Sequence, residues 1–133
     1  MSVYLWNILD PRGTSQLDTW ARDQRLTAAD RAALNSKLDL LTQLGFDYAV
    51  EVGLLRGPLA LDPSIYKLRA ASASRTFLLF LCPGPLEPDS STILSAALEV
   101  DGSMNPTTSL KDAKAAREAL IIDPERRVVH ERF

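Results

Sequence analysis

Hydrophobic and polar positions over the first third of the chain predict one strand and two helices. Residues 4–9 are rich in aromatic and β-branched side chains and precede the turn sequence Asp-Pro-Arg-Gly, which is typical of a strand that ends at a turn. Apolar residues then recur at helical spacing over 14–25 and, as a stripe of leucines, over 27–45. Thr27 can cap the second helix and Gly45 can end it. We expect the two helices to form an antiparallel hairpin.

Two later segments change to the period of a β-strand. Residues 64–70 alternate, which places Lys67 and Arg69 on the more polar face of a strand. Residues 75–81 begin with Arg75 and continue as an almost unbroken apolar run, as expected of a central strand covered on both faces. Only a short break separates the two segments. They therefore predict a β-hairpin that holds two arginines beside strongly apolar strands.

The remaining segments carry weaker signals. Residues 46–63 contain glycines and prolines that interrupt any period, and we expect a loop or a partial helix there. Residues 92–100 are interpreted as a strand, although their alanines and leucines also suit a helix. A helix is predicted from Ser109 through Leu120, and a proline and a charged tail follow it.

This order of elements predicts one α+β domain over residues 1–133. The expected fold is a small antiparallel sheet with an N-terminal helical hairpin packed on one face and a C-terminal helix. Hydrophobic residues make up 46% of the chain and charged residues 24%, which is typical of a soluble globular domain. No apolar run approaches the roughly 20 residues that a membrane span needs, so we expect a cytoplasmic protein without membrane contact.

Charge and metal-binding residue types exclude several classes of function. The formal net charge is −2, with 15 Lys and Arg against 17 Asp and Glu, which argues against a non-specific nucleic-acid binder but leaves room for a local cationic patch. Cys82 is the only cysteine and His130 the only histidine, so neither an internal disulfide nor a structural zinc site is expected. No cofactor or metal is implied, and no glycine-rich phosphate loop or nucleophile elbow occurs.

Several segments also match a known family in their order and spacing. They are the leucine-rich helix that ends at Leu44-Gly45, the motifs Tyr66-Lys67-Leu68-Arg69 and Arg75-Thr76-Phe77-Leu78-Leu79-Phe80, the apolar strand over 93–98, and Pro106 followed by Asp112-Ala113-Lys114-Ala115-Ala116-Arg117. In these segments the chain resembles the RelE/ParE toxin superfamily, in particular its phage-derived RelE-like (HigB-like) branch. The resemblance extends over most of the chain.

The resemblance implies a compact RNase-like fold and the toxin role in a bacterial toxin-antitoxin system. Such toxins are ribosome-dependent mRNA endonucleases, or mRNA interferases, which need no metal and are neutralised by a cognate antitoxin; a homodimer is compatible with this role. Arg69 and Arg75 match the strand arginines that hold the scissile phosphate, and Lys67 and Lys111 are expected to assist in RNA binding. His130 matches the C-terminal proton-transfer residue if the tail folds back over the sheet. These residue types suit RNA cleavage, because charge develops on the phosphate and a proton must move near neutral pH.

Other interpretations of the same residues stay open. Arg69 also suits an ordinary surface position, Arg75 a structural ion pair, and His130 a mobile terminal segment. Residues 99–105 hold two acids where this toxin branch usually has a lysine-rich turn, and the whole chain is acidic where ribosome-targeting toxins are generally basic. One alternative is therefore a catalytically degenerate RelE-fold protein-binding module. Another is an unrelated small phage-encoded interaction protein.

Overall fold

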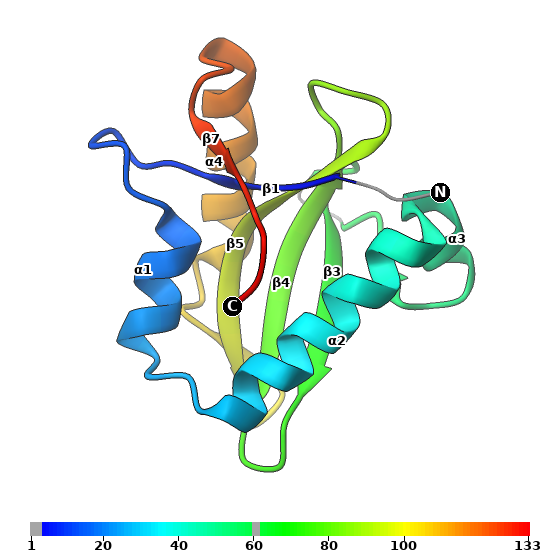
Figure 1. Ribbon diagram of the computed structural model, residues 1–133, viewed down its shortest axis with the longest axis vertical. Helices are drawn as coiled ribbons and strands as arrows, with labels where there is room; N and C mark the ends of the chain where they lie inside the picture. The colour runs from blue at the N-terminus through cyan, green and yellow to red at the C-terminus, as the bar shows by residue number, and fades with distance from the viewer. Residues whose placement is uncertain (1–3, 60–61) are drawn as a thin grey trace.

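A mixed β-sheet with helices on both faces forms the centre of the computed structural model, which describes residues 4–59 and 62–133 (Figure 1). The strands lie in the order β2-β3-β4-β5-β1-β7, and β6 pairs with the far end of β5. In the described ranges they are β1 (Tyr4–Ile8), β2 (Leu55–Arg56), β3 (Tyr66–Ala71), β4 (Thr76–Pro83), β5 (Ser90–Val100), β6 (Ser103–Asn105) and β7 (Arg127–Val129).

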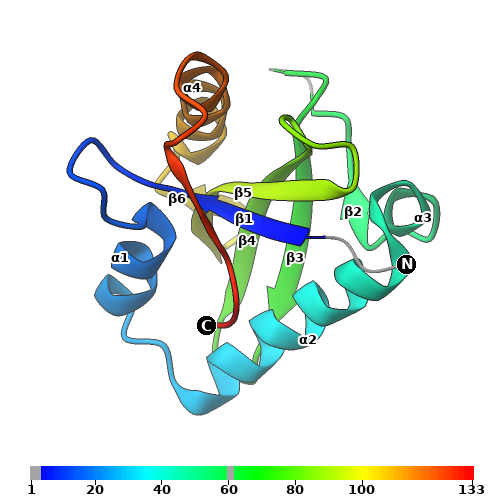
Figure 2. The ribbon, with the colours of Figure 1, turned by 45° about the horizontal axis from the view of Figure 1, so that its top comes forward.

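Helices cover the sheet from two sides. The described residues form α1 (Gln16–Asp23), α2 (Ala28–Leu44), α3 (Phe46–Glu51) and α4 (Ser109–Ile122). We call the face toward α1 and α2 the front face and the face toward α4 the back face (Figures 1 and 2). On β4, Phe77 and Leu79 belong to the front core, whereas Leu78 and Phe80 belong to the back core. This strand is buried on both faces, as its apolar run predicts.

The expected fold class is wrong in two respects. The sheet is not antiparallel throughout, because β1 lies beside β5 and runs parallel to it, with Tyr4 opposite Ser90 and Asn7 opposite Ile93. The helices α1 and α2 do not form an N-terminal helical hairpin either: α1 contacts β1 and β5, whereas α2 contacts β3 and α3. Periodicity identifies the apolar face of an element but not the neighbour that covers it, so neither arrangement could be inferred from the pattern.

Polar contacts anchor the two helices to separate strands. Ser15 caps α1 by accepting a hydrogen bond from the backbone N–H of Asp18, and it donates its hydroxyl to Asn7 of β1 at 2.8 Å. Thr27 and Asp30 form a capping box at the start of α2. Asp30 also accepts a hydrogen bond of 2.6 Å from the Ser72 hydroxyl, just after β3. The first helix is thus tied to β1 and the second to the β3–β4 connection.

Most individual elements are confirmed. The capped helix expected over 27–45 is α2, the hairpin is β3 and β4, and the C-terminal helix is α4. Residues 92–100 belong to the strand β5 and not to a helix. The segment 46–63 contains α3 and β2, and its residues 60 and 61 lie outside the described ranges.

The acidic segment 99–105 forms the end of the β5–β6 hairpin. Asp101 and Gly102 have φ angles of 51° and 79°, the left-handed backbone that a two-residue hairpin turn requires. The register places Glu99 opposite Met104 of β6 and Thr76 of β4. Because Met104 packs in the back core, Glu99 also projects from the back face.

Candidate functional site

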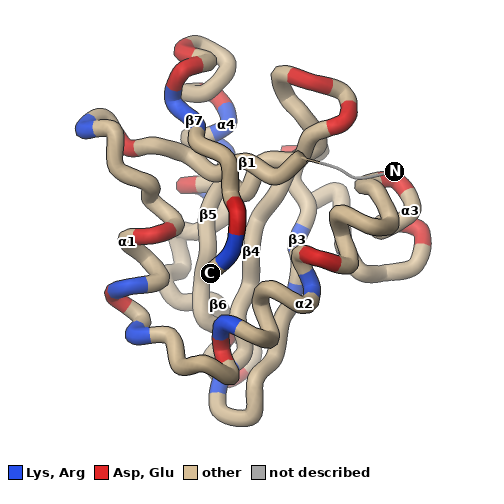
Figure 3. Tube along the Cα trace, in the orientation of Figure 1, with Lys and Arg blue, Asp and Glu red and all other residues tan. Residues whose placement is uncertain are grey.

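Three cationic residues lie side by side on the back face at the β2–β3 edge of the sheet. Arg56 of β2 is directly opposite Lys67 of β3, and Arg69 follows two residues later on the same face. Figure 3 shows positive charge along β3, whereas the loop between β4 and β5 is acidic. The three side chains, with Lys37 of α2, line a hollow of about 640 Å³ that we call the basic hollow. Its other lining residues are Gly53, Leu54, Ala71 and Glu99.

Arg69 is not free in the basic hollow, because Glu99 of β5 reaches across β4 and pairs with it. The Nε and Nη2 groups of Arg69 donate hydrogen bonds of 3.2 and 2.9 Å to Glu99 Oε2. These hydrogen bonds lower the pKa of Glu99. Burial opposes them, and the positive charges of Arg69 and Lys67 add to the decrease. Glu99 is therefore ionised at neutral pH. Lys37, Arg56 and Lys67 are the cations of the hollow that have no carboxylate partner among the described residues.

The chemistry of the basic hollow suits a polyanion. Arginine presents planar paired donors to phosphate oxygens, and lysine adds a point charge. Clustered cations of this kind bind the phosphate backbone of nucleic acids. None of the residues that line the hollow is a histidine, the residue whose ordinary pKa lies closest to neutral pH. The hollow can hold and neutralise phosphate, but its lining includes no histidine to move a proton.

Lys111 and the other basic residues of α4 lie outside this hollow. Lys111 is exposed on the solvent side of α4. Lys114 and Arg117 approach Asp62, whose pKa is lowered first by hydrogen bonds from Ser64 and then by these two positive charges. None of these α4 residues lines the hollow.

Arg75 lies at the β3–β4 connection and holds α1 and α2 in place. Its guanidinium pairs with the buried carboxylate of Asp30 and donates hydrogen bonds to the backbone carbonyls of Gln24 at 2.8 Å and Arg25 at 3.4 Å. It also lies over the ring of Phe77, 5.3 Å from the centroid. These contacts correspond to the structural ion pair that the sequence left open as an alternative.

His130 is buried on the front face, directly after β7. The tail does fold back over the sheet: the His130 N–H donates to the Leu5 carbonyl at 2.9 Å, and Asn7 Nδ2 lies 3.2 Å from His130 Nδ1. Nδ1 accepts this hydrogen bond, so the ring proton is assigned to Nε2, which has no partner among the described residues. Burial lowers the pKa of His130, and the charge of Asp18 opposes this only in part.

The structure therefore separates the three residues that the resemblance assigns to catalysis. Arg69 lies on the back face, His130 lies on the front face, and Arg75 is engaged in the contacts between the β3–β4 connection and the front helices. Arg69 and Lys67 do share one site. Its further members, Arg56 and Lys37, were missed because nothing in the sequence shows that β2 pairs with β3 or that the middle of α2 passes beside them. Only the alternation of 64–70 signalled the site.

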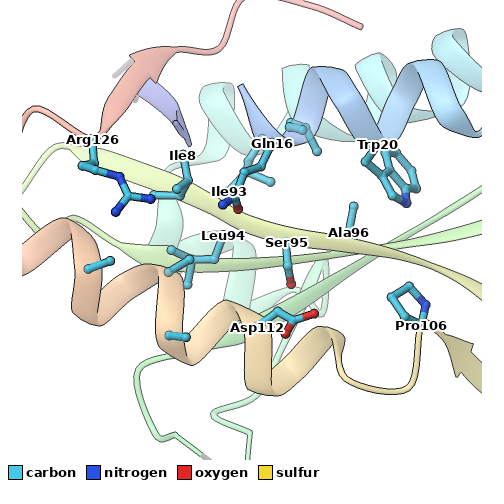
Figure 4. Close-up of a pocket in the computed structure, with 14 residues that line it drawn as sticks. Ile8, Gln16, Trp20, Ile93, Leu94, Ser95, Ala96, Pro106, Asp112 and Arg126 are labelled. Carbon is cyan, nitrogen blue, oxygen red and sulfur yellow. The ribbon is translucent and has the colours of Figure 1, made fainter. Parts of the chain in front are cut away.

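A second hollow of about 520 Å³, the α1–α4 cleft, is lined by those two helices and by residues 93–96 of β5, which runs between them (Figure 4). Its walls are mostly apolar and include Leu17, Trp20 and Ala116, while Asp112 and Arg126 supply charge. Apolar walls with few polar groups are typical of sites that take a small ligand or an apolar side chain of a partner.

Comparison with known proteins finds no matching family model, no matching curated protein and no matching solved structure. Among the described residues, no group of three His, Cys, Asp or Glu side chains is placed to hold a metal ion. A separate search of the same ranges finds no helix with the length and apolar character needed to cross a membrane. The function is therefore argued from the basic hollow and from the motifs in the sequence.

Proposed function

We propose that this protein is the toxin component of a bacterial toxin-antitoxin system, that it cleaves mRNA on the ribosome in the cytoplasm, and that RNA binds in the basic hollow. The observation that carries the proposal is the placement of Arg56, Lys67 and Arg69 on one face and at one edge of the sheet. Two of these residues belong to the motif Tyr66-Lys67-Leu68-Arg69, on which the resemblance to RelE-like toxins depends. A cognate antitoxin is the expected protein partner.

In the proposed reaction the 2′-hydroxyl of the RNA attacks the adjacent phosphorus. The bond from phosphorus to the 5′ oxygen breaks, a 2′,3′-cyclic phosphate forms, and the proton lost from the 2′-hydroxyl is balanced by one taken up by the leaving oxygen. Arg69 stabilises the charge that develops on the phosphate, and Arg56 and Lys67 hold neighbouring phosphates. Because the basic hollow holds no histidine, we assign the proton transfer to water or to groups of the ribosome.

Arg69→Ala is expected to abolish growth arrest on expression and to reduce mRNA cleavage by about 100-fold or more, as the loss of one group that stabilises transition-state charge commonly does. The measurement is growth and mRNA integrity after induction at matched protein levels. Arg12→Ala, which removes an exposed arginine outside the hollow, is the matched control and should arrest growth like the wild type. Equal growth arrest by Arg69→Ala and the wild type would contradict the proposal.

A second candidate function is that of a protein-binding module without nuclease activity. Two observations favour it: Arg69 is paired with Glu99, and His130 lies on the opposite face of the sheet. The α1–α4 cleft would then receive an apolar part of the partner. Purified wild-type protein that leaves translated mRNA intact in a ribosome assay, yet binds the product of an adjacent small gene, would favour this function over cleavage.

A further inference from the structure

We propose that Glu99 is a built-in competitor for phosphate in the basic hollow, so that RNA reaches Arg69 only by displacing the Glu99 carboxylate. The inference deepens the proposed function and rests on RNA binding at this site. Glu99 is the one acidic residue among the described side chains that line the hollow, where it faces four cations. It is therefore placed to determine which anions the hollow accepts.

The contact with Arg69 resembles the one that a phosphate would make. Two donors of the guanidinium, Nε and Nη2, converge on a single oxygen, Glu99 Oε2. Phosphate oxygens fit the same donors, because carboxylate and phosphate match the geometry of arginine alike. Two anions cannot share this edge of the guanidinium without strong repulsion. Binding of phosphate and pairing with Glu99 are therefore mutually exclusive at this edge.

The ion pair can open without disturbing the core. The side chains of Arg69 and Glu99 are 57% and 26% exposed, respectively, and ion pairs at such positions contribute little to stability. The backbone of Glu99 is held by pairing on both sides, with β4 and with β6. Displacement therefore needs only rotation of the side chain toward solvent, and the strand stays in place.

Competition by Glu99 selects ligands by the number of their phosphates. An isolated phosphate that displaces Glu99 gains Arg69 but leaves an unpaired carboxylate beside it. A strand of RNA gains contacts with Arg56 and Lys67 at the same time, and these cations have no competing carboxylate among the described residues. The hollow should therefore bind consecutive phosphates of single-stranded RNA and discriminate against inorganic phosphate.

The test compares Glu99→Gln, which keeps the shape of the side chain and removes its charge, with Asp101→Asn as a control for the net charge. Asp101 lies in the hairpin turn two residues away, does not line the hollow, and has a left-handed backbone that asparagine tolerates. The probe is a short fluorescent single-stranded RNA with 2′-O-methyl groups, which cannot be cleaved. Its dissociation constant is measured by anisotropy between about 50 and 200 mM salt, and inorganic phosphate is used as a competitor.

Glu99→Gln is expected to bind the RNA about fivefold more tightly at low salt. The slope of log K against log salt concentration should become steeper by about 0.7, which corresponds to one additional phosphate contact. Inorganic phosphate should also compete more effectively than it does with the wild type. Asp101→Asn should change the affinity by less than about twofold, because its charge is screened by solvent. Wild type and Glu99→Gln that bind RNA equally would overturn the inference and leave the proposed function intact. No RNA binding by either protein would overturn both.

Discussion

Arg75→Ala should lower the free energy of unfolding by about 3 kcal/mol, at the lower end of the range for breaking a buried ion pair because Arg75 itself is partly exposed. The substitution leaves the Asp30 carboxylate buried beside Ser72 and removes the donors to the carbonyls of Gln24 and Arg25. For a chain of this length the melting temperature should fall by about 10 °C. Thermal or urea unfolding, followed by circular dichroism, measures the effect.

Arg69→Ala is the matched control, because it also removes a strand arginine and its ion pair, but at an exposed position. Its melting temperature should stay close to that of the wild type. If Arg69→Ala destabilised the protein as much as Arg75→Ala, the division between a binding arginine and a structural one would be wrong.

The stability of the fold at low pH should depend on the same ion pair, through the carboxyl group of Asp30. Burial alone would raise the pKa of Asp30, but hydrogen bonds from Ser72, Thr27 and Arg75 outweigh it and hold the pKa well below its ordinary value. A carboxyl whose pKa is lower in the folded state stabilises the fold above the pKa of the unfolded chain, about 4, and this stabilisation is lost as the pH falls through the folded value. Arg75→Ala removes one of these donors, so acid unfolding should begin at a higher pH.

The double variant Arg56→Ala/Lys67→Ala should weaken binding of single-stranded RNA on the order of 50-fold at about 50 mM salt. Each cation contributes one phosphate contact and the associated release of counterions. The slope of log K against log salt concentration should therefore become shallower by about 1.4. Because Arg69 is paired with Glu99, these two residues, with Lys37, supply the attraction of the hollow for phosphate. Anisotropy titrations with the 2′-O-methyl RNA measure both quantities.

The matched control is Arg12→Ala/Arg22→Ala, which gives the same change in net charge at exposed positions outside the hollow. We expect its affinity to remain within about twofold of the wild type, since charges farther away than a Debye length are largely screened. An equal loss of affinity in both double variants would mean that the protein attracts RNA by its net charge and not through the basic hollow.

The local elements could be predicted because their signals lie within a few residues of one another. The capping box at Thr27 and the left-handed glycine at Gly45 determine where α2 begins and ends. The apolar run of β4 is long enough to indicate burial on both faces. The same local alternation placed Lys67 and Arg69 on one face of β3.

The wrong predictions concern contacts between residues far apart in the chain. The parallel pairing of β1 with β5 joins residues that are more than 80 positions apart, and no feature of residues 4–9 specifies that partner. His130 is buried because Asn7 and the Leu5 carbonyl bind the tail, which a terminal segment of mixed charge does not reveal. Arg56 joins the basic hollow only through its register with Lys67. Arg75 fits a phosphate ligand or an ion pair equally well until Asp30 is seen beside it.

Nuclear magnetic resonance is the most direct test that RNA binds at the β2–β3 edge of the sheet. In a titration of the isotope-labelled protein with the 2′-O-methyl RNA, we expect the amide and guanidinium signals of Arg56, Lys67, Arg69 and Glu99 to shift together. The signals of His130 on the opposite face should stay unchanged. Shifts confined to the α1–α4 cleft or to the His130 side of the sheet would contradict the account.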